Sequence, residues 1–135
     1  MKILLDTHCF LWWLMEPERL NRQARDLLRA SENDLYLSAA SAWEMSIKYS
    51  LGKLKLPDPP QLFVPMTLAE QSMKSLEIHT IHALEAGGLP EFHRDPFDRI
   101  LVAQSSLEKM KLLTADRIFE QYADHLSVPS IWAGP

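Results

Sequence analysis

The hydrophobic positions of this chain fall into two alternating kinds of pattern. Residues 2–6, 35–37, 76–78, 112–114 and 127–131 are short, mainly apolar runs, which are typical of buried β-strands. The segments between them carry apolar residues at helical spacing and predict helices over residues 7–15, 39–51, 67–75, 81–86, 96–110 and 117–122, with one more after residue 21. Strands that alternate with helices predict a parallel sheet covered on both faces.

Start and stop signals support several of these helices. Asn21 is suited to be an N-cap, and Ser38 or Ser41 can cap the helix over 39–51, which Gly52 ends. Asp95 can cap the helix over 96–110, with Pro96 at its first position.

One region interrupts the alternation. The stretch KLKLPDPPQLFVP, residues 53–65, contains four of the nine prolines. We expect an ordered arm there, with no helix interior and no central strand, because proline removes a backbone donor. The next helix is then expected over Thr67–Ser75, where Thr67 and Glu70 form a capping-box pattern.

Composition narrows the class of protein. With 135 residues and 47% hydrophobic content, the chain should form one domain, 1–135, with a core of its own. Its net charge of −4 argues against a general nucleic-acid coat protein, although a local basic patch stays possible. The single cysteine, Cys9, excludes a disulfide framework, and no apolar run or cleavage site suggests a membrane span or a signal peptide. We expect a soluble, cytoplasmic protein.

Acidic residues stand where a parallel sheet would gather them. Asp6 ends the first strand, Asp116 follows the strand over 112–114, Glu44 lies in the helix after the second strand, and Asp98 lies in the first turn of a later helix. Ligands of such sheets bind at the carboxyl ends of the strands. Carboxylates brought together repel unless cations or raised pKa values relieve them. Mg²⁺ and Mn²⁺ prefer oxygen ligands, and such a cluster can activate a water beside a phosphate.

Each carboxylate also has an ordinary structural explanation. The acid that ends the first strand could bond nearby backbone, and Glu44 could pair with Lys48 four residues later. Asp98 could be a first-turn acid favoured by the helix dipole, and Asp95 and Asp116 could be caps. The joint pattern therefore carries more weight than any one residue.

Other kinds of site have weaker support. The chain has no glycine-rich phosphate loop and no G-x-S-x-G turn, and its histidines show no convincing ligand spacing. Trp12 and Trp13 fit a core or a partner surface better than a base-stacking platform. Arg94, Arg99 and Arg117 adjoin the proposed acids and could attract a phosphate backbone.

Four segments, taken in order, resemble a known family. MKILLDTHCFLWWL, SAASAWEMSIKYSLGKLKL, HRDPFDRILVAQ and LLTADRIFEQY are similar to the PIN-domain nucleases, and most of all to the VapC-type toxins of bacterial toxin–antitoxin modules. The resemblance spans nearly the whole chain. It implies a three-layer α/β/α sandwich around a central, mainly parallel sheet, and Mg²⁺- or Mn²⁺-dependent cleavage of RNA phosphodiester bonds.

The same resemblance assigns roles to individual residues. The four catalytic, metal-binding acids of the family fall on Asp6, Glu44, Asp98 and Asp116, with Asp95 as an additional carboxylate for the metal. Hydroxyl positions that orient the metal ligands fall on Thr7 and Thr114. No acid of the family pattern is missing, so the resemblance implies an active nuclease.

A protein partner is implied as well. VapC-type toxins are held inactive by an antitoxin whose C-terminal segment lies in a groove near the acidic site, and many form homodimers. Phe10, Leu11, Trp12, Trp13 and the proline-rich arm are expected to supply that groove.

Two other classes of function remain open from the sequence. One is a metal-dependent phosphohydrolase with a small substrate, although His8 stands where a phosphatase would have a second aspartate. The other is a non-catalytic binding module whose acids neutralise a basic partner. Stabilisation by Mn²⁺ distinguishes a metal site from such a module.

Overall fold

A computed structural model describes all residues, 1–135, and contains one five-stranded sheet. The strands lie in the order β3-β2-β1-β4-β5, and every neighbouring pair is parallel. The predicted parallel sheet is thus confirmed, with the N-terminal strand at its centre. The strands are β1 (Lys2–Leu5), β2 (Asp34–Ser38), β3 (Lys74–Leu76), β4 (Lys111–Thr114) and β5 (Ile131–Trp132).

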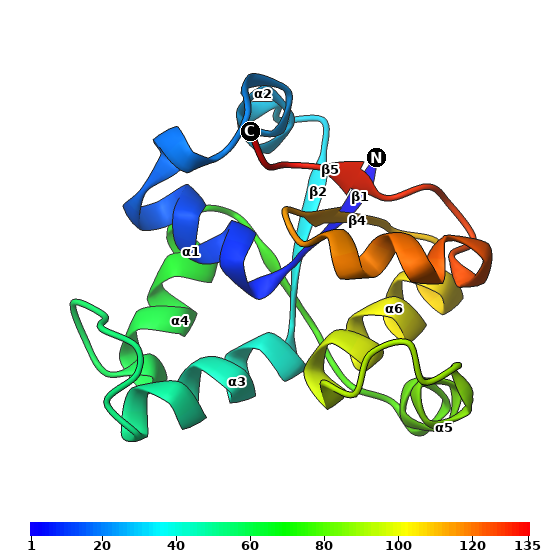
Figure 1. Cartoon of the computed structure of the whole chain (residues 1–135). Helices are drawn as coiled ribbons and strands as arrows, with labels where there is room; N and C mark the ends of the chain where they lie inside the picture. The colour runs from blue at the N-terminus through cyan, green and yellow to red at the C-terminus, as the bar shows by residue number, and fades with distance from the viewer.

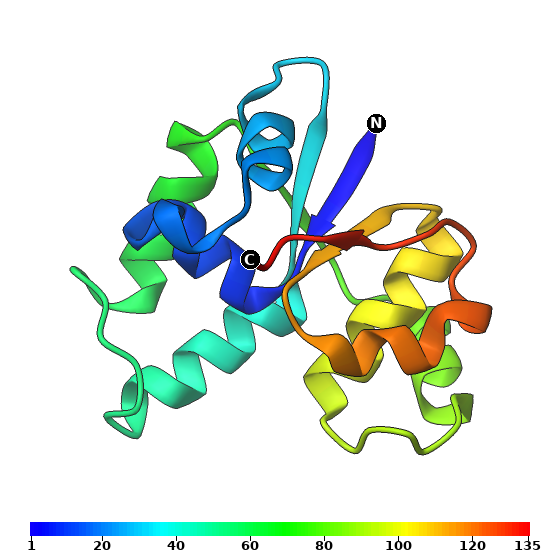
Figure 2. The same ribbon diagram turned by 45° about the horizontal axis from the view of Figure 1, so that its top comes forward.

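Helices cover both faces of this sheet, as Figures 1 and 2 show. Side chains of β1 alternate between the faces, so Ile3 and Leu5 join one hydrophobic cluster while Leu4 joins the other. The first cluster draws on α1 (Thr7–Met15), α2 (Arg22–Arg29), α3 (Ala39–Ser50) and α4 (Pro60–Glu70). The second draws on α6 (Pro96–Glu108), on the 3₁₀-helix η2 (Arg117–His125) and on Leu89, the residue that directly follows α5 (Thr80–Gly88). A further 3₁₀-helix, η1 (Pro17–Arg19), follows α1. The result is the predicted three-layer sandwich.

The predicted helix caps are present. The Asn21 side chain accepts a hydrogen bond from the backbone N–H of Ala24 at 2.8 Å, and Asp95 accepts one from Phe97 at 2.9 Å. Of the two candidates for α3, Ser38 is the cap, because its hydroxyl accepts from the N–H of Ala40 at 3.0 Å. Capping satisfies donors that a helix leaves unpaired, so these ends are set by local sequence.

The largest error of the sequence prediction lies in the proline-rich region. The arm ends at Pro59, and α4 runs from Pro60 to Glu70 with Pro65 inside it. Pro60 occupies the first helical position, where a missing N–H costs nothing, and burial of Val64 and Thr67 holds the helix despite Pro65. The predicted helix over Thr67–Ser75 is thus correct only as far as Glu70 and wrong beyond it, since β3 begins at Lys74.

Smaller differences occur at other boundaries. β3 begins two residues earlier than predicted, α5 includes both residues of its glycine pair, and β5 is only two residues long. The segment after β4 is a 3₁₀-helix rather than an α-helix. No helix has the length and apolar character needed to cross a membrane.

Two of the residues predicted to line a partner groove on α1 are not at the surface. Phe10 and Leu11 belong to the buried core, so neither can line a surface groove. Trp12 and Trp13 are only partly buried, and each lies under an arginine, Arg19 and Arg29 respectively. Apolar residues occur on several sides of α1 because the helix contacts β4 of the sheet, η1 and α3.

Asn21 also joins the end of the chain to the first layer. Its side-chain amide donates to the carbonyl oxygens of Trp132 and Gly134, both at 2.9 Å. Its backbone N–H donates to the carbonyl of Ala133 at 2.8 Å. One side chain therefore caps α2 and anchors the segment that contains β5.

We predict that Asn21→Ala lowers the free energy of unfolding by about 2–4 kcal/mol, because a cap and two further hydrogen bonds are lost. Asn21→Ser is the matched control: its hydroxyl keeps an N-cap acceptor but removes the two amide donors, so it should cost less. Urea denaturation measures both. A loss below about 0.5 kcal/mol for Asn21→Ala, the range of an ordinary surface substitution, would contradict this role.

Candidate metal centre

The predicted acids converge at the carboxyl edge of the sheet. They line a hollow of about 150 Å³ that has no hydrophobic lining residue. We call it the acidic hollow; its residues are Asp6, His8, Glu44, Lys48, His93, Asp95, Asp98 and Asp116. All five carboxylates proposed as metal ligands are among them, although they lie in α3 and α6, just before α6, or just after β1 and β4.

Asp6 lies deepest in the acidic hollow. It follows β1 and is 3% exposed, and its carboxylate makes no capping bond to α1. The hydroxyl of Thr114, at the end of β4, donates to one carboxylate oxygen at 2.8 Å. Burial raises the pKa of the Asp6 carboxyl above its ordinary value. The Thr114 oxygen also accepts from the backbone N–H of Asp116 at 3.0 Å, so one hydroxyl contacts two of the acids.

Thr7 acts differently from the prediction. Its hydroxyl donates to the Ser41 hydroxyl at 2.8 Å and bonds none of the acids. This buried contact joins the first turn of α1 to the first turn of α3. Thr7 therefore influences the acidic hollow by placing α3, the helix that carries Glu44.

Glu44 lines the acidic hollow and also pairs with Lys48, the two roles that its position in the sequence allowed. It is 5% exposed, yet one carboxylate oxygen accepts from the ammonium of Lys48 at 2.7 Å. The pair has the expected i, i+4 spacing, but it lies in the hollow and not on an open surface. The bond to Glu44 raises the pKa of the Lys48 ammonium, so the cation persists beside the acids.

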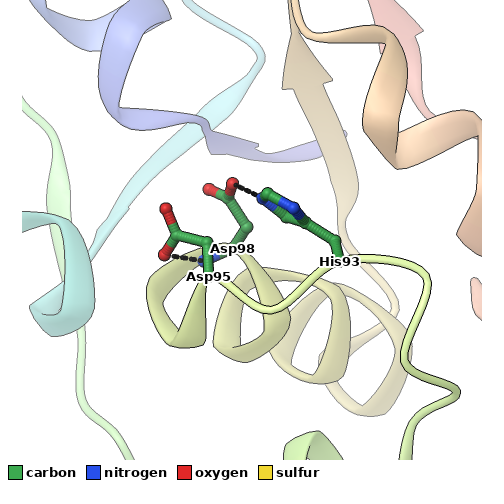
Figure 3. A group of neighbouring side chains, drawn as sticks. All are labelled: His93, Asp95 and Asp98. Carbon is green, nitrogen blue, oxygen red and sulfur yellow. Dashed lines mark hydrogen bonds and ion pairs between the residues drawn. The ribbon is translucent and has the colours of Figure 1, made fainter.

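Asp95 and Asp98 stand together at the start of α6 (Figure 3). One oxygen of Asp95 caps the helix and leaves the other free for a ligand. Asp98 lies 2.7 Å from Nε2 of His93. Burial, and then the charges of Asp6 and Asp95, raise the pKa of Asp98 to about 7, although His93 opposes the shift. One potential ligand atom from each of His93, Asp95 and Asp98 lies within 4.8 Å of the others.

His8, Lys48 and His93 are the residues of the acidic hollow that sequence reasoning missed. Lys48 was noted only as a partner of Glu44, and its place in the hollow depends on how α3 packs. His93 meets Asp98 because the loop before α6 folds back over the helix start. Its backbone N–H donates to the Tyr122 hydroxyl at 3.0 Å, a contact between residues 29 apart. A contact between residues so far apart in the chain cannot be predicted from the spacing of residues in the sequence.

The arginines proposed to attract RNA differ in their surroundings. The Arg99 guanidinium donates to the carbonyls of Ala86 and Leu89 at 2.8 Å, of Pro90 at 2.9 Å and of His93 at 3.2 Å. It thus holds the loop before α6 and is not free for a phosphate, which corrects the prediction for this residue. Arg94 is exposed and makes no ion pair, whereas Arg117 pairs with Glu120 at the surface.

The donor set suits a hard divalent cation. Five carboxylates supply oxygen ligands of the kind that Mg²⁺ and Mn²⁺ bind, and the imidazole of His93 adds a nitrogen. Lys48 offsets only part of the negative charge. The raised pKa values of Asp6 and Asp98 show the physical consequence: without a cation, these buried acids favour protonation.

The fold and the site define a class of protein: a parallel α/β sandwich with acidic residues gathered at the carboxyl ends of its strands. The family model described as "PIN domain" matches residues 3–125, so the chain belongs to the PIN-domain family.

Two curated relatives come from Mycobacterium tuberculosis. Ribonuclease VapC22 is 28% identical over 131 residues, which cover 96% of this chain and 98% of the relative. Ribonuclease VapC16 is 37% identical over 68 residues, so that match spans 48% of each protein.

Solved structures share the fold. A VapBC2 complex from Rickettsia felis, bound to a promoter DNA fragment, matches with a TM-score of 0.71 at 15% identity, covering 98% of this chain and 99% of that one. A toxin–antitoxin complex from Klebsiella pneumoniae matches with a TM-score of 0.61 at 19% identity, covering 87% and 89%.

We predict that the metal-free protein loses stability as pH rises from about 4 to 7. Folding raises the pKa of Asp98 from 3.8 to about 7, so its stabilising contribution is complete below the lower value and lost above the higher one. Asp98→Asn should flatten this decline by at most a few kcal/mol. Urea unfolding in EDTA at several pH values tests it, with exposed Asp124→Asn as control. Parallel pH curves for wild type and Asp98→Asn would refute the assignment.

Arg99 and Arg94 offer a second comparison. Arg99→Gln should lower the free energy of unfolding by about 2–4 kcal/mol, because several bonds from a charged donor are lost. Arg94→Gln should change it by less than about 0.5 kcal/mol. Thermal and urea denaturation measure both variants. Equal stabilities would show that the Arg99 bonds do not hold the loop.

Proposed function

We propose that this protein is a divalent-metal-dependent endoribonuclease and the toxin of a toxin–antitoxin module. The observation that carries the proposal is the convergence of Asp6, Glu44, Asp95, Asp98 and Asp116 in one hollow of a PIN fold. The names of the relatives, Ribonuclease VapC22 and Ribonuclease VapC16, support RNA as the substrate.

Asp6, Glu44, Asp98 and Asp116 would hold Mg²⁺ or Mn²⁺, with the free oxygen of Asp95 available beside them. When bound, such a cation polarises a phosphodiester, stabilises developing negative charge and lowers the pKa of water. The residues around the acids keep them in place. Thr114 orients Asp6, Lys48 contacts Glu44, and His93 contacts Asp98.

RNA must approach a protein whose net charge is −4. Arg94 and Arg117 are exposed next to Asp95 and Asp116, at two sides of the acidic hollow. Local positive charge next to a metal site is enough to attract a phosphate backbone. We therefore retain these two arginines, without Arg99, as the RNA-contacting cations.

An antitoxin is the partner that we propose. The similar structures from Rickettsia felis and Klebsiella pneumoniae are described as a VapBC2 complex and a toxin–antitoxin complex. This chain also exposes large apolar side chains on α3 and α4, including Trp43, which is 62% exposed, Leu62 and Met66. Exposed apolar patches of this kind commonly mark a protein interface. Homodimerisation and a cytoplasmic location stay predictions.

The two alternative functions predict different behaviour. A small-substrate phosphohydrolase would hydrolyse a phosphomonoester and leave RNA intact. A binding module would have no need of Mn²⁺, and metal would not stabilise it. The buried position of Asp6 and Glu44 favours catalysis, because acids that neutralise a basic tail have no reason to be desolvated.

We predict that the purified protein, free of any antitoxin, cuts total RNA into discrete fragments with Mn²⁺ or Mg²⁺ and not with EDTA. Glu44→Gln and Asp98→Asn should each lower the rate by at least about 100-fold, since each removes a charged ligand. Both variants should stay folded because they relieve repulsion between buried acids. Gel analysis of the RNA and circular dichroism measure these outcomes.

Glu70→Gln is the matched control, since Glu70 is an exposed acid at the end of α4, outside the acidic hollow. It should cleave at the wild-type rate. Full activity of Asp98→Asn would disprove the assigned site. No cleavage by wild-type protein that binds Mn²⁺ would favour the phosphohydrolase, and absence of Mn²⁺ binding as well would favour the binding module.

A further inference from the structure

A second hollow opens directly beside the acidic one. It has a volume of about 380 Å³, within the range of about 300–1,000 Å³ that is usual for small-ligand sites. Three of its lining residues, Asp6, His8 and Asp116, also line the acidic hollow. The remaining ones are Trp12, Ala115 and Arg117, and we call the space the Trp12–Arg117 hollow. A ligand can therefore occupy both hollows at once.

The two hollows are lined by different kinds of side chain. The acidic hollow has five carboxylates and no apolar wall. In the Trp12–Arg117 hollow the only carboxylates are the two shared ones, and an indole and a guanidinium take the place of the others. Metal and phosphate chemistry fit the first hollow, whereas a flat, polar-edged ring fits the second.

Trp12 is placed to offer an aromatic surface. It stands one helical turn after His8 on α1, and the two rings lie 6.0 Å apart and tilted by 42°. The Arg19 guanidinium lies 4.8 Å from the indole centroid and supports the ring. Trp12 is only partly buried, so part of the indole stays open to the hollow.

Arg117 also lines the hollow, and contacts with Trp132 and Glu120 orient its side chain. Its guanidinium lies 3.8 Å from the Trp132 ring centroid, and it pairs with Glu120 at 2.6 Å. Both members of that pair are more than half exposed, so the pair is weak and can exchange for another partner. A stacked guanidinium can contact the edge of a base or a phosphate oxygen.

We propose that the Trp12–Arg117 hollow is the subsite for a nucleobase next to the scissile phosphodiester of single-stranded RNA. The inference rests on the proposed nuclease function. Unpaired bases are recognised by stacking on aromatic side chains and arginine planes. The base stacks on Trp12, while His8 and Arg117 face its polar edges and determine which base is preferred.

The assignment revises the role expected for Trp12. Its apolar surroundings in the sequence suggested core or a partner surface, and part of its ring does contact the first hydrophobic cluster. The position of its open part, beside Asp6 and Asp116, is what indicates a role with RNA.

The test compares the cleavage of total RNA by wild type, Trp12→Ala, Trp12→Phe and Leu84→Ala, with cut positions mapped by sequencing. Leu84 is the control because it is an exposed apolar residue on α5, outside both hollows. Trp12→Ala should raise KM by roughly 5- to 100-fold, the range of one lost base–aromatic stack, and should lose the base preference beside the cut. Trp12→Phe should retain that preference, and all four proteins should bind Mn²⁺ equally.

A second readout needs no variant at Trp12. The four nucleoside 5′-monophosphates are titrated into wild-type protein while the indole N–H signals are followed by NMR. At least one nucleotide should shift the Trp12 signal and leave Trp43 unchanged. Binding that leaves Trp12 unchanged would overturn the subsite.

The outcomes separate the two levels of inference. Wild-type protein that cuts RNA while Trp12→Ala keeps the same KM and the same cut positions would overturn the subsite and leave the nuclease function intact. An equal loss in Leu84→Ala would also overturn it. If wild-type protein cuts no RNA, the proposed function fails and the subsite fails with it.

Discussion

The structure depends above all on the burial of one carboxylate, that of Asp6, at the end of the central strand. A buried acid is costly unless it is neutralised or bonded, and here a single hydroxyl from Thr114 reaches it. Its N–H is fixed by the carbonyl of Leu113, so β1 and β4 hold the residue from both ends. The remaining acids gather around this position because the parallel sheet brings its strand ends to the same edge.

Hydrogen bonds and ion pairs from neighbouring residues oppose the repulsion between the acids. Neighbouring side chains hold the acids in place: Lys48 contacts Glu44, and His93 contacts Asp98. Arg99 holds the loop that carries His93. Such networks hold side chains in position before any ligand binds, which lowers the cost of ordering them. Without a cation, the buried acids repel one another, and burial and this repulsion raise the pKa of Asp98.

Local sequence was a good guide wherever a short-range interaction decides the structure. The caps at Asn21, Ser38 and Asp95 were predicted because each side chain bonds a backbone N–H two or three residues away. The proline-rich region was misread for the opposite reason. Proline disfavours a helix interior locally, but packing of Val64 against the core outweighs that preference around Pro65.

The sequence by itself determined the alternation of strands and helices, the five acids and their family pattern, because these are properties of spacing and residue type. Only the tertiary structure decided that His93 meets Asp98, that Arg99 holds a loop and that Trp12 borders the acidic hollow. These contacts depend on where loops and helix faces come to rest. Such placement results from packing among residues far apart in the chain, which no local pattern records.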